Sequence, residues 1–508
     1  MTPKPANRES TRAEPADLVA RAAKRHIVVV GGGAGGLIAA RECVKVGMRV
    51  TLLEGSDAVG GAIRRAELDG IVVDAGAESY ATRGGRVRAL LEELGLTDRI
   101  VAPAAGGAWL AGIPGVGAAP LPVGGILGIP GNPFQEDVRR VIGWSGAWRA
   151  YLDRVRPPLT IGHNHSLGKL VSSRMGAKVR DRLVAPVTTG VYSASPDDVD
   201  VDIAAPGLNA ALTSVGSLSG AVQALREQSA ARAAQAPGAA VEGIDGGMMV
   251  LVEALVADIE KLGGVVRTAA RVTDITQAGD AWSVRAEAKT TVDASDESDA
   301  GEAEDLDLTA DGVVIATSED VARRLLDKAV PALAETTAAD APEIEIVTLL
   351  LAASALDGAP RGTGVLTVPG SHTAKALTHS SAKWGWVRDA AGGRHLLRVS
   401  FGAQGEPAAT AGLDDAAAAR LALREASALL GVPLPESVLV DAHRARYVQS
   451  QPASIIGSAA RREAARSAIQ AVSGVAAVGA WLAGTGLAQV IPDAREEADR
   501  LRRALLWD

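Results

Sequence analysis

The sequence has 508 residues, of which 47% are hydrophobic and 22% charged, and its formal net charge is -8. These values exclude a disordered chain and a small disulfide scaffold, and the length allows two or three domains. The single cysteine, Cys43, excludes an intramolecular disulfide and a cysteine zinc cluster, and the acidic balance argues against nucleic acid as the main partner.

The first 24 residues are polar and charged, contain prolines, and lack the apolar core of a signal peptide. We therefore predict a flexible tail over residues 1–24 on a cytoplasmic protein. No run of about 18 apolar residues occurs, so we expect no membrane-spanning segment, while peripheral attachment stays open.

Residues 26–30 form a β-branched run that is followed by glycines and then by apolar residues at helical spacing, namely Leu37, Ala40 and Val44. A second β-type run over residues 48–54 ends at Glu54. Together these segments predict a right-handed βαβ unit of about 30 residues. The chain therefore opens with a dinucleotide-binding domain, whose first part we assign to residues 25–105.

The rest of the chain divides by composition and periodicity. We predict a helical, substrate-side insertion over residues 106–240, a second part of the dinucleotide-binding domain over 241–320, a substrate-binding domain over 321–465 and a third dinucleotide-binding part over 466–508. The acidic stretch 286–311 is expected to form the solvated tip of a hairpin. The predicted fold class is α/β: a discontinuous Rossmann-like domain, a mixed-sheet α+β substrate domain and an inserted helical region.

The first glycine turn matches G-x-G-x-x-G at Gly31, Gly33 and Gly36. These positions supply a tight turn, close approach of backbone to a pyrophosphate, and close helix–strand packing. In a chain with 57 glycines the pattern alone is weak. Glu54 strengthens it, because a carboxylate at the end of the second strand can accept hydrogen bonds from ribose hydroxyls and would repel a 2'-phosphate. This favours FAD or NAD over NADP, although a strand-end glutamate is commonly only a solvated tip.

The stretch EGSDAVGGAIRRAELDGIVVDAGAESYATR, residues 54–83, resembles the flavin-dependent amine oxidase superfamily, with Gly60 and Gly61 as its paired-glycine turn. Within that superfamily the chain is similar to the porphyrinogen oxidase branch. The similar segments are AGAESYATR (75–83), LLEELGL (90–96), SLGKLVSSRMG (166–176), PVTTGVYSASPDDV (186–199), GIDGGMMVLVEAL (243–255) and GAWLAGTGLAQVI (479–491). The segment 186–199 is the most specific, because general amine oxidases lack it.

The resemblance implies an FAD-binding role for the dinucleotide domain and a position for each contact. The residues implied are Gly31, Gly32, Gly33, Ala34, Gly35 and Gly36 at the diphosphate, Glu54 and Gly55 at the ribose, Ala62 and Val272 on the adenine side, Gly76, Ala77, Glu78 and Ser79 near the flavin ring, Tyr447 beside the cofactor, and Thr485, Gly486 and Leu487 at the pyrimidine end.

Two features qualify these contacts. Position 62 is alanine where the family usually has a basic residue, so Arg64 or Arg65 could replace that contact. Cys43 falls in the first helix, far from the expected flavin methyl groups, so we expect non-covalent FAD.

The resemblance implies oxidation of coproporphyrinogen III to coproporphyrin III in heme biosynthesis, with O2 as acceptor and H2O2 released. A ferrochelatase could receive the product. Protoporphyrinogen IX oxidation, an amine or carotenoid-type flavin oxidoreductase, and a flavin protein without turnover remain alternatives. Because such a substrate is electron-rich, no strong base is required, and we assign no catalytic residue.

No metal site is predicted, because the seven histidines show no metal-ligand spacing. Arg83 and Lys383 are candidate cations for the substrate carboxylates, as are Arg444 and Arg446, although charged residues of this kind are more often only surface charges. Trp384, Trp386 and Trp481 could line a planar cavity or pack in a core.

Overall fold

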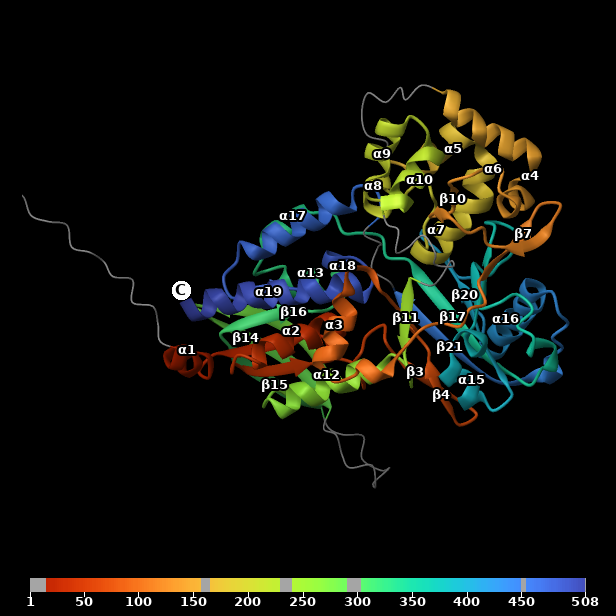
Figure 1. The fold of residues 1–508 in the computed structure, drawn as a ribbon. Helices are drawn as coiled ribbons and strands as arrows, with labels where there is room; N and C mark the ends of the chain where they lie inside the picture. The colour runs from red at the N-terminus through yellow and green to blue at the C-terminus, as the bar shows by residue number, and fades with distance from the viewer. Residues whose placement is uncertain (1–14, 157–164, 229–239, 290–302, 449–453, 508) are drawn as a thin grey trace, which may run out of the picture.

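The computed structural model describes residues 15–156, 165–228, 240–289, 303–448 and 454–507. Figure 1 shows three parts: the unit that contains the two ends of the described chain at the left, a group of helices at the upper right, and a large sheet with helix α16 at the lower right. The first and the last of these parts are built from segments that lie far apart in the sequence, whereas the helices of the second part all come from residues 136–228.

The first part has a five-stranded sheet in the order β12-β2-β1-β16-β22, and all four pairings are parallel. Its strands are β12 Val265–Arg267, β2 Arg49–Leu53, β1 His26–Val30, β16 Gly312–Ile315 and β22 Val475–Ala477. Helices α2 Ala34–Val44, α12 Met249–Lys261 and α19 Leu487–Trp507 pack on one face. This arrangement confirms the predicted Rossmann-like fold, because parallel strands need helical crossovers.

The other face of this sheet is covered by an antiparallel sheet of β13 Ala270–Ala278, β14 Ala281–Lys289 and β15 Ala303–Ala310. The predicted acidic tip over residues 286–311 was too long, because β14 pairs with β15 out to Lys289 and Ala303. In β15 the half-buried Leu306 and Leu308 alternate with exposed Asp305 and Asp307, a period-2 pattern that the high acidity obscured. Residues 290–302 lie outside the described chain.

The large sheet has seven strands in the order β21-β17-β20-β19-β18-β7-β8, and only β18 and β7 pair in parallel. The strands are β21 Leu439–Val448, β17 Glu343–Leu351, β20 His395–Phe401, β19 Ala376–His379, β18 Gly364–Thr367, β7 Ala108–Ile113 and β8 Gly117–Pro120. Helix α16, Asp415–Leu430, packs on one face. Strands β7 and β8 therefore join the substrate-side sheet, although we expected a helical insertion to begin at residue 106.

The helical part supplies a separate core. Its elements are α4 Glu136–Tyr151, η3 Leu152–Val155, α5 Leu167–Met175, α6 Ala177–Val179, the π-helix Arg180–Val184, α7 Ala185–Tyr192, α8 Val201–Ala204, α9 Leu208–Val215 and α10 Leu218–Gln228. Short strands β9 Gly125–Ile126 and β10 Ile129–Pro130 lead into it. The predicted helical region is thus present, with its boundary displaced toward the C-terminus.

Smaller elements connect these parts. They are β3 Arg65–Leu68, β4 Ile71–Asp74, β5 Tyr80–Ala81, η1 Arg83–Gly85, α3 Arg86–Glu93, η2 Thr97–Arg99, β6 Ile100–Val101, β11 Val241–Ile244, α13 Glu319–Leu326, η5 Pro331–Glu335, η6 Ser354–Leu356, α14 Ser380–Lys383, α15 Gly385–Ala391, η7 Glu436–Val438, α17 Ser458–Gln470 and α18 Ala480–Ala483.

The N-terminal segment departs from its prediction. Residues Pro15–Ala22 form helix α1, where a flexible tail was expected through residue 24. Ala22 is buried in the core of the parallel sheet, and Arg21 and Arg25 donate to carbonyl oxygens near the end of α19. These long-range contacts hold a segment whose own sequence is polar. Among the described residues, no helix is long and apolar enough to cross a membrane.

Candidate functional site

The glycine turn between β1 and α2 has the geometry that its spacing predicts. Gly31 has φ +108°, and a Cβ there would lie 2.5 Å from the Ala316 carbonyl oxygen. A Cβ on Gly36 would lie 2.0 Å from the Gly31 carbonyl oxygen, so only glycine allows this helix–strand contact. Around Gly33 nothing lies within 4 Å of such an added atom. The middle glycine therefore exposes backbone, as close approach of a diphosphate requires.

Glu54 lies at the end of β2, next to this turn. Its carboxylate accepts hydrogen bonds from the Gly32 N–H (2.6 Å), the Ser56 N–H (2.9 Å) and the Ser56 hydroxyl (2.7 Å). These bonds fix an acceptor where the ribose of an adenine dinucleotide meets a Rossmann fold. Gly55 beside it is exposed and faces Arg271, with 3.6 Å between its added Cβ and the Arg271 Cα.

Val272, the residue after Arg271, is nearly buried in β13. The start of β13 is held to the end of β2, because the Ala270 N–H donates to the Glu54 carbonyl oxygen at 2.8 Å. The fold therefore brings the predicted ribose and adenine residues together. Their contacts with a cofactor stay predictions.

The paired-glycine turn at Gly60 and Gly61 packs against the first glycine turn. Gly60 donates its N–H to the Gly32 carbonyl oxygen at 2.8 Å. Ala62 is exposed, and Arg64 donates from Nε to the Gly61 carbonyl oxygen at 3.0 Å. Arg65 instead pairs with Glu253 on α12. Of the two arginines considered as substitutes for a basic residue at position 62, Arg64 therefore has the better location.

The segment Gly76–Ser79 lies against this turn and against β21. The Ala77 N–H donates to the Ala62 carbonyl oxygen at 3.1 Å. A Cβ on Gly76 would lie 2.9 Å from the Tyr447 hydroxyl oxygen, so Tyr447 and Gly76 are neighbours. Their contacts with a flavin stay predictions. Burial raises the pKa of Tyr447, and its hydroxyl is buried with no hydrogen-bond partner among the described residues. A buried hydroxyl without a partner fits a site that a bound polar group completes.

Glu78 is the centre of a buried charge cluster that we call the Glu78 cluster: Glu78, Ser380, Lys383 and Arg398. The carboxylate pairs with Lys383 Nζ at 2.6 Å and Arg398 at 2.9 Å, and the Ser380 hydroxyl donates to it at 3.0 Å. Burial acts to raise the pKa of Glu78, but Lys383 and Arg398 outweigh it and lower the pKa to about 2. The carboxylate is therefore ionised at neutral pH.

Arg398 also holds the backbone of the flavin-side segment. It donates to the carbonyl oxygens of Ala75 (3.1 Å) and Gly76. Arg398 projects from the middle of β20, and the same face of the sheet carries Thr348 and Tyr447, as the strand register shows. The large sheet thus reaches the predicted flavin site through Arg398 and Tyr447. The sequence analysis missed Arg398, although an arginine inside the apolar run HLLRVSF was the available signal.

Lys383 was predicted to bind a substrate carboxylate. Its ammonium instead contacts Glu78, so in this structure it balances a charge of the protein itself. Arg444 and Arg446, considered for the same task, both pair with Glu345, each at 2.8 Å. Glu345 shares the α16 face of the sheet with Val347, opposite to Tyr447. Neither arginine therefore lies on the face of the sheet that carries Arg398 and Tyr447.

Arg83, the other predicted cation, is exposed at the start of η1. It is close enough to Tyr192 to act on the pKa of that phenol, which burial raises and Arg83 lowers in part. Tyr192 and Ser193 end α7 within the distinctive stretch 186–199. Lys375 also contacts the end of α7, because its Nζ donates to the Ser193 hydroxyl at 2.7 Å. Burial lowers the pKa of Lys375 to about 8.

The loop before α19 belongs to the C-terminal region that packs on the first glycine turn. Gly486 has φ +103°, and its carbonyl oxygen accepts from the Gln489 N–H at 3.0 Å and the Val490 N–H at 3.1 Å. Thr485 and Gly486 are exposed, and Leu487 starts α19. A Cβ on Gly35 would lie 3.2 Å from the Gly479 Cα, so this C-terminal region packs on the first glycine turn. The helix start can stabilise negative charge nearby.

Asp74 and His379 are two further buried titratable groups. Burial raises the pKa of Asp74 to about 7, while its carboxylate accepts the Met248 N–H at 2.9 Å. His379 contacts His395 at 3.2 Å between ring nitrogens, and burial lowers its pKa to about 4. No group of three potential metal ligands occurs in the described part of the chain.

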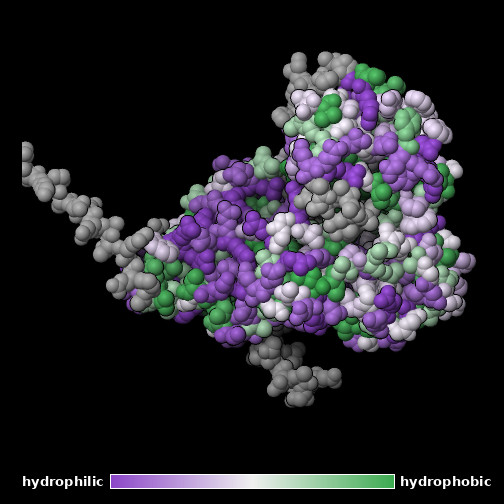
Figure 2. Space-filling view, in the orientation of Figure 1, coloured by the Kyte–Doolittle hydropathy of each residue, from purple (hydrophilic) through white to green (hydrophobic). Residues whose placement is uncertain are grey.

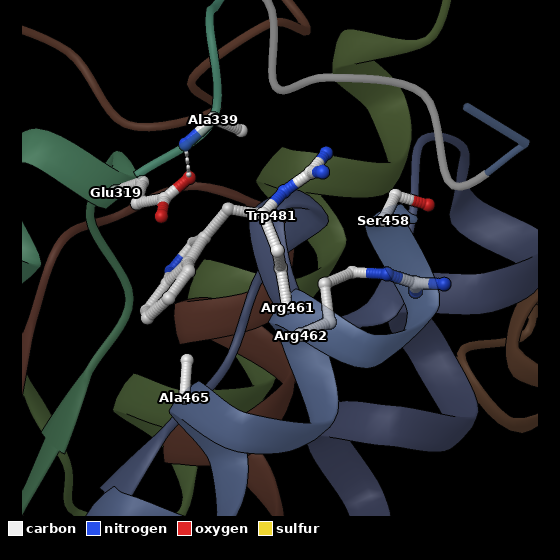
Figure 3. Close-up of a pocket in the computed structure, with 7 residues that line it drawn as sticks. All are labelled: Glu319, Ala339, Ser458, Arg461, Arg462, Ala465 and Trp481. Atoms are coloured by element: carbon white, nitrogen blue, oxygen red, sulfur yellow. Dashed lines mark hydrogen bonds between the residues drawn. The ribbon is translucent and has the colours of Figure 1, made fainter. Parts of the chain in front are cut away.

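A small cavity of about 20 Å³ lies elsewhere, between α13, α17 and α18 (Figure 3). Glu319, Arg462 and Trp481 line it, and the indole nitrogen of Trp481 is buried without a hydrogen-bond partner among the described residues. The volume accommodates about one water molecule. It excludes a flavin or a macrocycle, and Trp481 is therefore part of a packed interior, as is the buried Trp384.

Residues 34–502 match the family model of flavin containing amine oxidoreductases. The chain belongs to this family. It is 32% identical over 403 residues to the coproporphyrinogen III oxidase of Mycobacterium tuberculosis (strain ATCC 25618 / H37Rv), covering 77% of this chain and 79% of that protein. It is 25% identical over 391 residues to the coproporphyrinogen III oxidase of Bacillus subtilis (strain 168), covering 75% and 78%.

Solved structures confirm the fold. The chain resembles a provisionally named protoporphyrinogen oxidase from Exiguobacterium sp. 255-15, with a TM-score of 0.77 and 21% identity over 94% of this chain and 99% of that one. Putrescine oxidase bound to putrescine gives a TM-score of 0.62 and 15% identity over 95% and 99%.

The predicted flavin cofactor is confirmed by the family. Cys43 is buried inside α2, and burial raises the pKa of its thiol to about 12. This burial supports the expectation of a flavin that is not bonded to the cysteine.

Proposed function

We propose that this flavin-containing oxidoreductase binds FAD non-covalently and oxidises coproporphyrinogen III to coproporphyrin III in heme biosynthesis, with O2 as acceptor and H2O2 as product. The observation that carries the proposal is the 32% identity to a coproporphyrinogen III oxidase over 77% of the chain. The distinctive stretch 186–199 supports it, because this stretch forms α7 and the turn next to the predicted site.

A bound flavin would supply the two-electron acceptor, and conversion of the porphyrinogen to the porphyrin would need three such oxidations, which together remove four bridge hydrogens and two N–H hydrogens and reduce three O2 to three H2O2. Glu78 is held ionised by Lys383 and Arg398, so it supplies no proton. The role of the Glu78 cluster is then positional. It fixes the backbone of Gly76–Ser79 against β20 and Tyr447, which keeps the flavin side of the site rigid.

The substrate carboxylates need cations, and we assign Arg83 and Lys375 to them. Both lie beside Tyr192–Ser193. Lys375 directly precedes β19, in which Thr378 pairs with Arg398, so the lysine lies three residues, about 10 Å, along the sheet from the Glu78 cluster. A half-buried ammonium with a depressed pKa is stabilised by a carboxylate ligand, because ion pairing offsets the loss of solvation.

The test is a side-by-side oxidation assay with the purified flavoprotein. Porphyrin fluorescence and H2O2 are followed with coproporphyrinogen III and with protoporphyrinogen IX, in air and under argon. We expect faster oxidation of coproporphyrinogen III, with H2O2 formed only in air. An equal rate under argon would remove O2 as acceptor, and a faster rate with the divinyl substrate would overturn the substrate assignment.

Protoporphyrinogen IX oxidation is the second candidate, favoured by the similarity to the Exiguobacterium structure. The assay above decides between them. H2O2 formed with putrescine or another simple amine would instead support an amine oxidase, and bound flavin without turnover of any substrate would support a binding protein.

We also propose a cytoplasmic reaction with transfer of the product to a ferrochelatase. In heme biosynthesis the oxidised macrocycle must next receive iron, so an enzyme that inserts the metal is the expected acceptor. Stopped-flow transfer of coproporphyrin to added ferrochelatase, at a rate that depends on the concentration of the acceptor protein, would support direct transfer. A rate independent of that concentration would indicate release to solvent.

A further inference from the structure

Helix α7 ends at a serine in the left-handed conformation. Ser193 caps the helix with φ 54° and ψ 31°. At the C-terminal ends of α9, α15 and α16 the left-handed capping residue is glycine, namely Gly216, Gly392 and Gly431. A side chain in this conformation costs free energy that glycine avoids, and glycine is the usual residue at such a cap. The strain at Ser193 therefore points to a task for the serine side chain.

Ser193 is 4% exposed and is held by both its backbone and its side chain. Its N–H donates to the Thr189 carbonyl oxygen at 3.1 Å, and its carbonyl oxygen accepts from the Gln404 N–H at 2.7 Å. Its Oγ accepts from Lys375 Nζ at 2.7 Å. Because the oxygen accepts this bond, the hydroxyl proton remains as a donor, and no described residue accepts it. The turn thus fixes a hydrogen-bond donor that has no acceptor in the described chain.

Lys375 supplies further donors at the same point. Its backbone is held by two strands, because its N–H donates to the Ser400 carbonyl oxygen at 2.9 Å and its carbonyl oxygen accepts from the Thr367 hydroxyl at 3.0 Å. The ammonium carries three N–H donors. Burial lowers the pKa of Lys375, and no acidic group among the described residues acts against this shift. The ammonium therefore lacks a counter-charge within the described chain.

This situation separates Lys375 from the other cations. Hydrophilic residues cover most of the face that carries α17 and α19 (Figure 2), so an exposed cation alone marks no site. Lys383 and Arg398, which are nearly buried, both contact the carboxylate of Glu78. Lys375 is half-buried, and its side chain donates to a hydroxyl group and not to a carboxylate. Its position favours an anion that comes from outside the chain.

The pair of Ser193 and Lys375 lies where the helical part meets the large sheet. Figure 1 shows α7 between these two parts. The helix packs closely on β18, since a Cβ on Gly190 would lie 2.5 Å from Leu366 Cδ2. Lys375 directly precedes β19, whose Thr378 pairs with Arg398. The pair therefore joins the distinctive stretch 186–199 to the sheet that reaches the predicted flavin site.

We propose that the Ser193 hydroxyl and the Lys375 ammonium together bind one carboxylate of the substrate, and that Ser193 selects substrates with a carboxylate at this position. Donor atoms 2.7 Å apart can each bond to one oxygen of a carboxylate. The lysine acts as a point charge, whereas a hydroxyl in a fixed turn donates in one direction. This inference rests on the proposed porphyrinogen substrate and adds the residue that distinguishes one porphyrinogen from another.

The discrimination follows from the substituents of the two substrates. Coproporphyrinogen III carries four propionate groups, whereas protoporphyrinogen IX carries vinyl groups in place of two of them. A vinyl group at Ser193 and Lys375 leaves a buried hydroxyl and an ammonium without a partner. Polar groups that stay unpaired on binding the wrong ligand disfavour that ligand strongly.

The test compares Ser193→Gly and Ser193→Ala with the wild-type flavoprotein. Both variants remove the hydroxyl, but only glycine relaxes the left-handed backbone, so Ser193→Ala should melt at the lower temperature of the two. In both, the KM for coproporphyrinogen III should rise about tenfold or more with kcat within about twofold, because a hydrogen bond to a charged group is lost. The KM for protoporphyrinogen IX should change less than about twofold. The matched control is Ala359→Gly, which relaxes a φ of 44° outside the site and should keep both KM values.

A second readout needs no turnover. Coproporphyrin III and protoporphyrin IX are titrated into each protein, and binding is followed by quenching of tryptophan fluorescence. Ser193→Gly should weaken the binding of coproporphyrin III about tenfold and leave that of protoporphyrin IX unchanged. Equal effects on the two ligands, no effect on the tetracarboxylate, or an effect in Ser193→Ala alone would overturn the inference. A wild type that oxidises neither porphyrinogen would instead remove the proposed function, and the titration alone would then decide the role of Ser193.

Discussion

Replacing Glu78 by glutamine tests the assignment of the Glu78 cluster most directly. Its pKa lies at about 2 in the folded protein, compared with an ordinary value of 4.5, and its side chain is 11% exposed. This difference corresponds to about 3 kcal/mol of favourable interaction with the ionised carboxylate. Glu78→Gln leaves Lys383 and Arg398 buried without a counter-charge. We expect the free energy of unfolding at pH 7 to fall by about 3 kcal/mol.

The pH dependence has a defined sign. Because the folded-state pKa of Glu78 is lowered, its contribution is present above about pH 4.5 and is lost as the pH falls toward 2. The wild type and Glu78→Gln should therefore differ most near neutral pH and converge in acid. The measurement is urea unfolding of both proteins at pH 7 and at stepwise lower pH, followed by tryptophan fluorescence and circular dichroism.

Glu253→Gln is the matched control. Glu253 forms an ion pair with Arg65 in which both side chains are about half exposed, at 55% and 49%, so its loss should change the unfolding free energy by less than about 1 kcal/mol. Adding Lys383→Met to Glu78→Gln should recover part of the stability, because one unpaired buried charge is removed. A loss in Glu78→Gln no larger than that of the control, or a difference that persists in acid, would refute the reasoning. Flavin content after gel filtration should fall in Glu78→Gln and stay unchanged in the control Glu253→Gln.

Other variants separate folding from cofactor binding. Gly36→Ala places a Cβ against the carbonyl oxygen of Gly31 and should lower both the melting temperature and the flavin content. Gly33→Ala, at φ -68° with open space around it, should keep the melting temperature and lose flavin. Equal melting temperatures for the two variants would contradict this. Tyr447→Phe removes a buried hydroxyl without a partner and should change unfolding by less than about 1 kcal/mol while flavin dissociates faster in a fluorescence assay. Lys375→Met should raise the unfolding free energy at pH 7 by roughly 1 to 3 kcal/mol, because a folded-state pKa of about 8 makes the ionised lysine unfavourable at neutral pH. This gain in stability over the wild type should disappear as the pH rises through 10. The same variant should raise the KM for coproporphyrinogen III more than it lowers kcat, and an unchanged KM would remove this lysine from the substrate site.

The parts of the fold that the sequence predicts well are those encoded by short-range pattern. The strand, turn, helix and strand over residues 26–54 follow from hydrophobic period and glycine spacing within one stretch of chain. Each glycine has the backbone role that its place in the motif implies. The β14–β15 hairpin was misjudged because acidity dominated its period-2 pattern. Helix α1 was missed because distant contacts, such as Arg25 with the end of α19, hold it in place.

The site was harder to predict, because its central group joins residues about 300 positions apart. Glu78 and Lys383 were assigned to different ligands, the flavin and the substrate. Only the pairing of β19 with β20 brings Ser380, Lys383 and Arg398 to the segment that carries Glu78. A sequence shows which charges exist but not which of them compensate one another.

This pairing changes the interpretation of the remaining cations. Lys383 and Arg398 share one carboxylate, Glu78, and Arg444 and Arg446 share another, Glu345. Each pair keeps an excess positive charge, but all four side chains are already held by carboxylates of the protein. Lys375 contacts a hydroxyl group, and Arg83 is exposed beside a phenol. Because a substrate with carboxylates binds most strongly where a cation is not already neutralised, the corner at Tyr192–Ser193 is the part of the site where we expect coproporphyrinogen to be distinguished from substrates with fewer carboxylates.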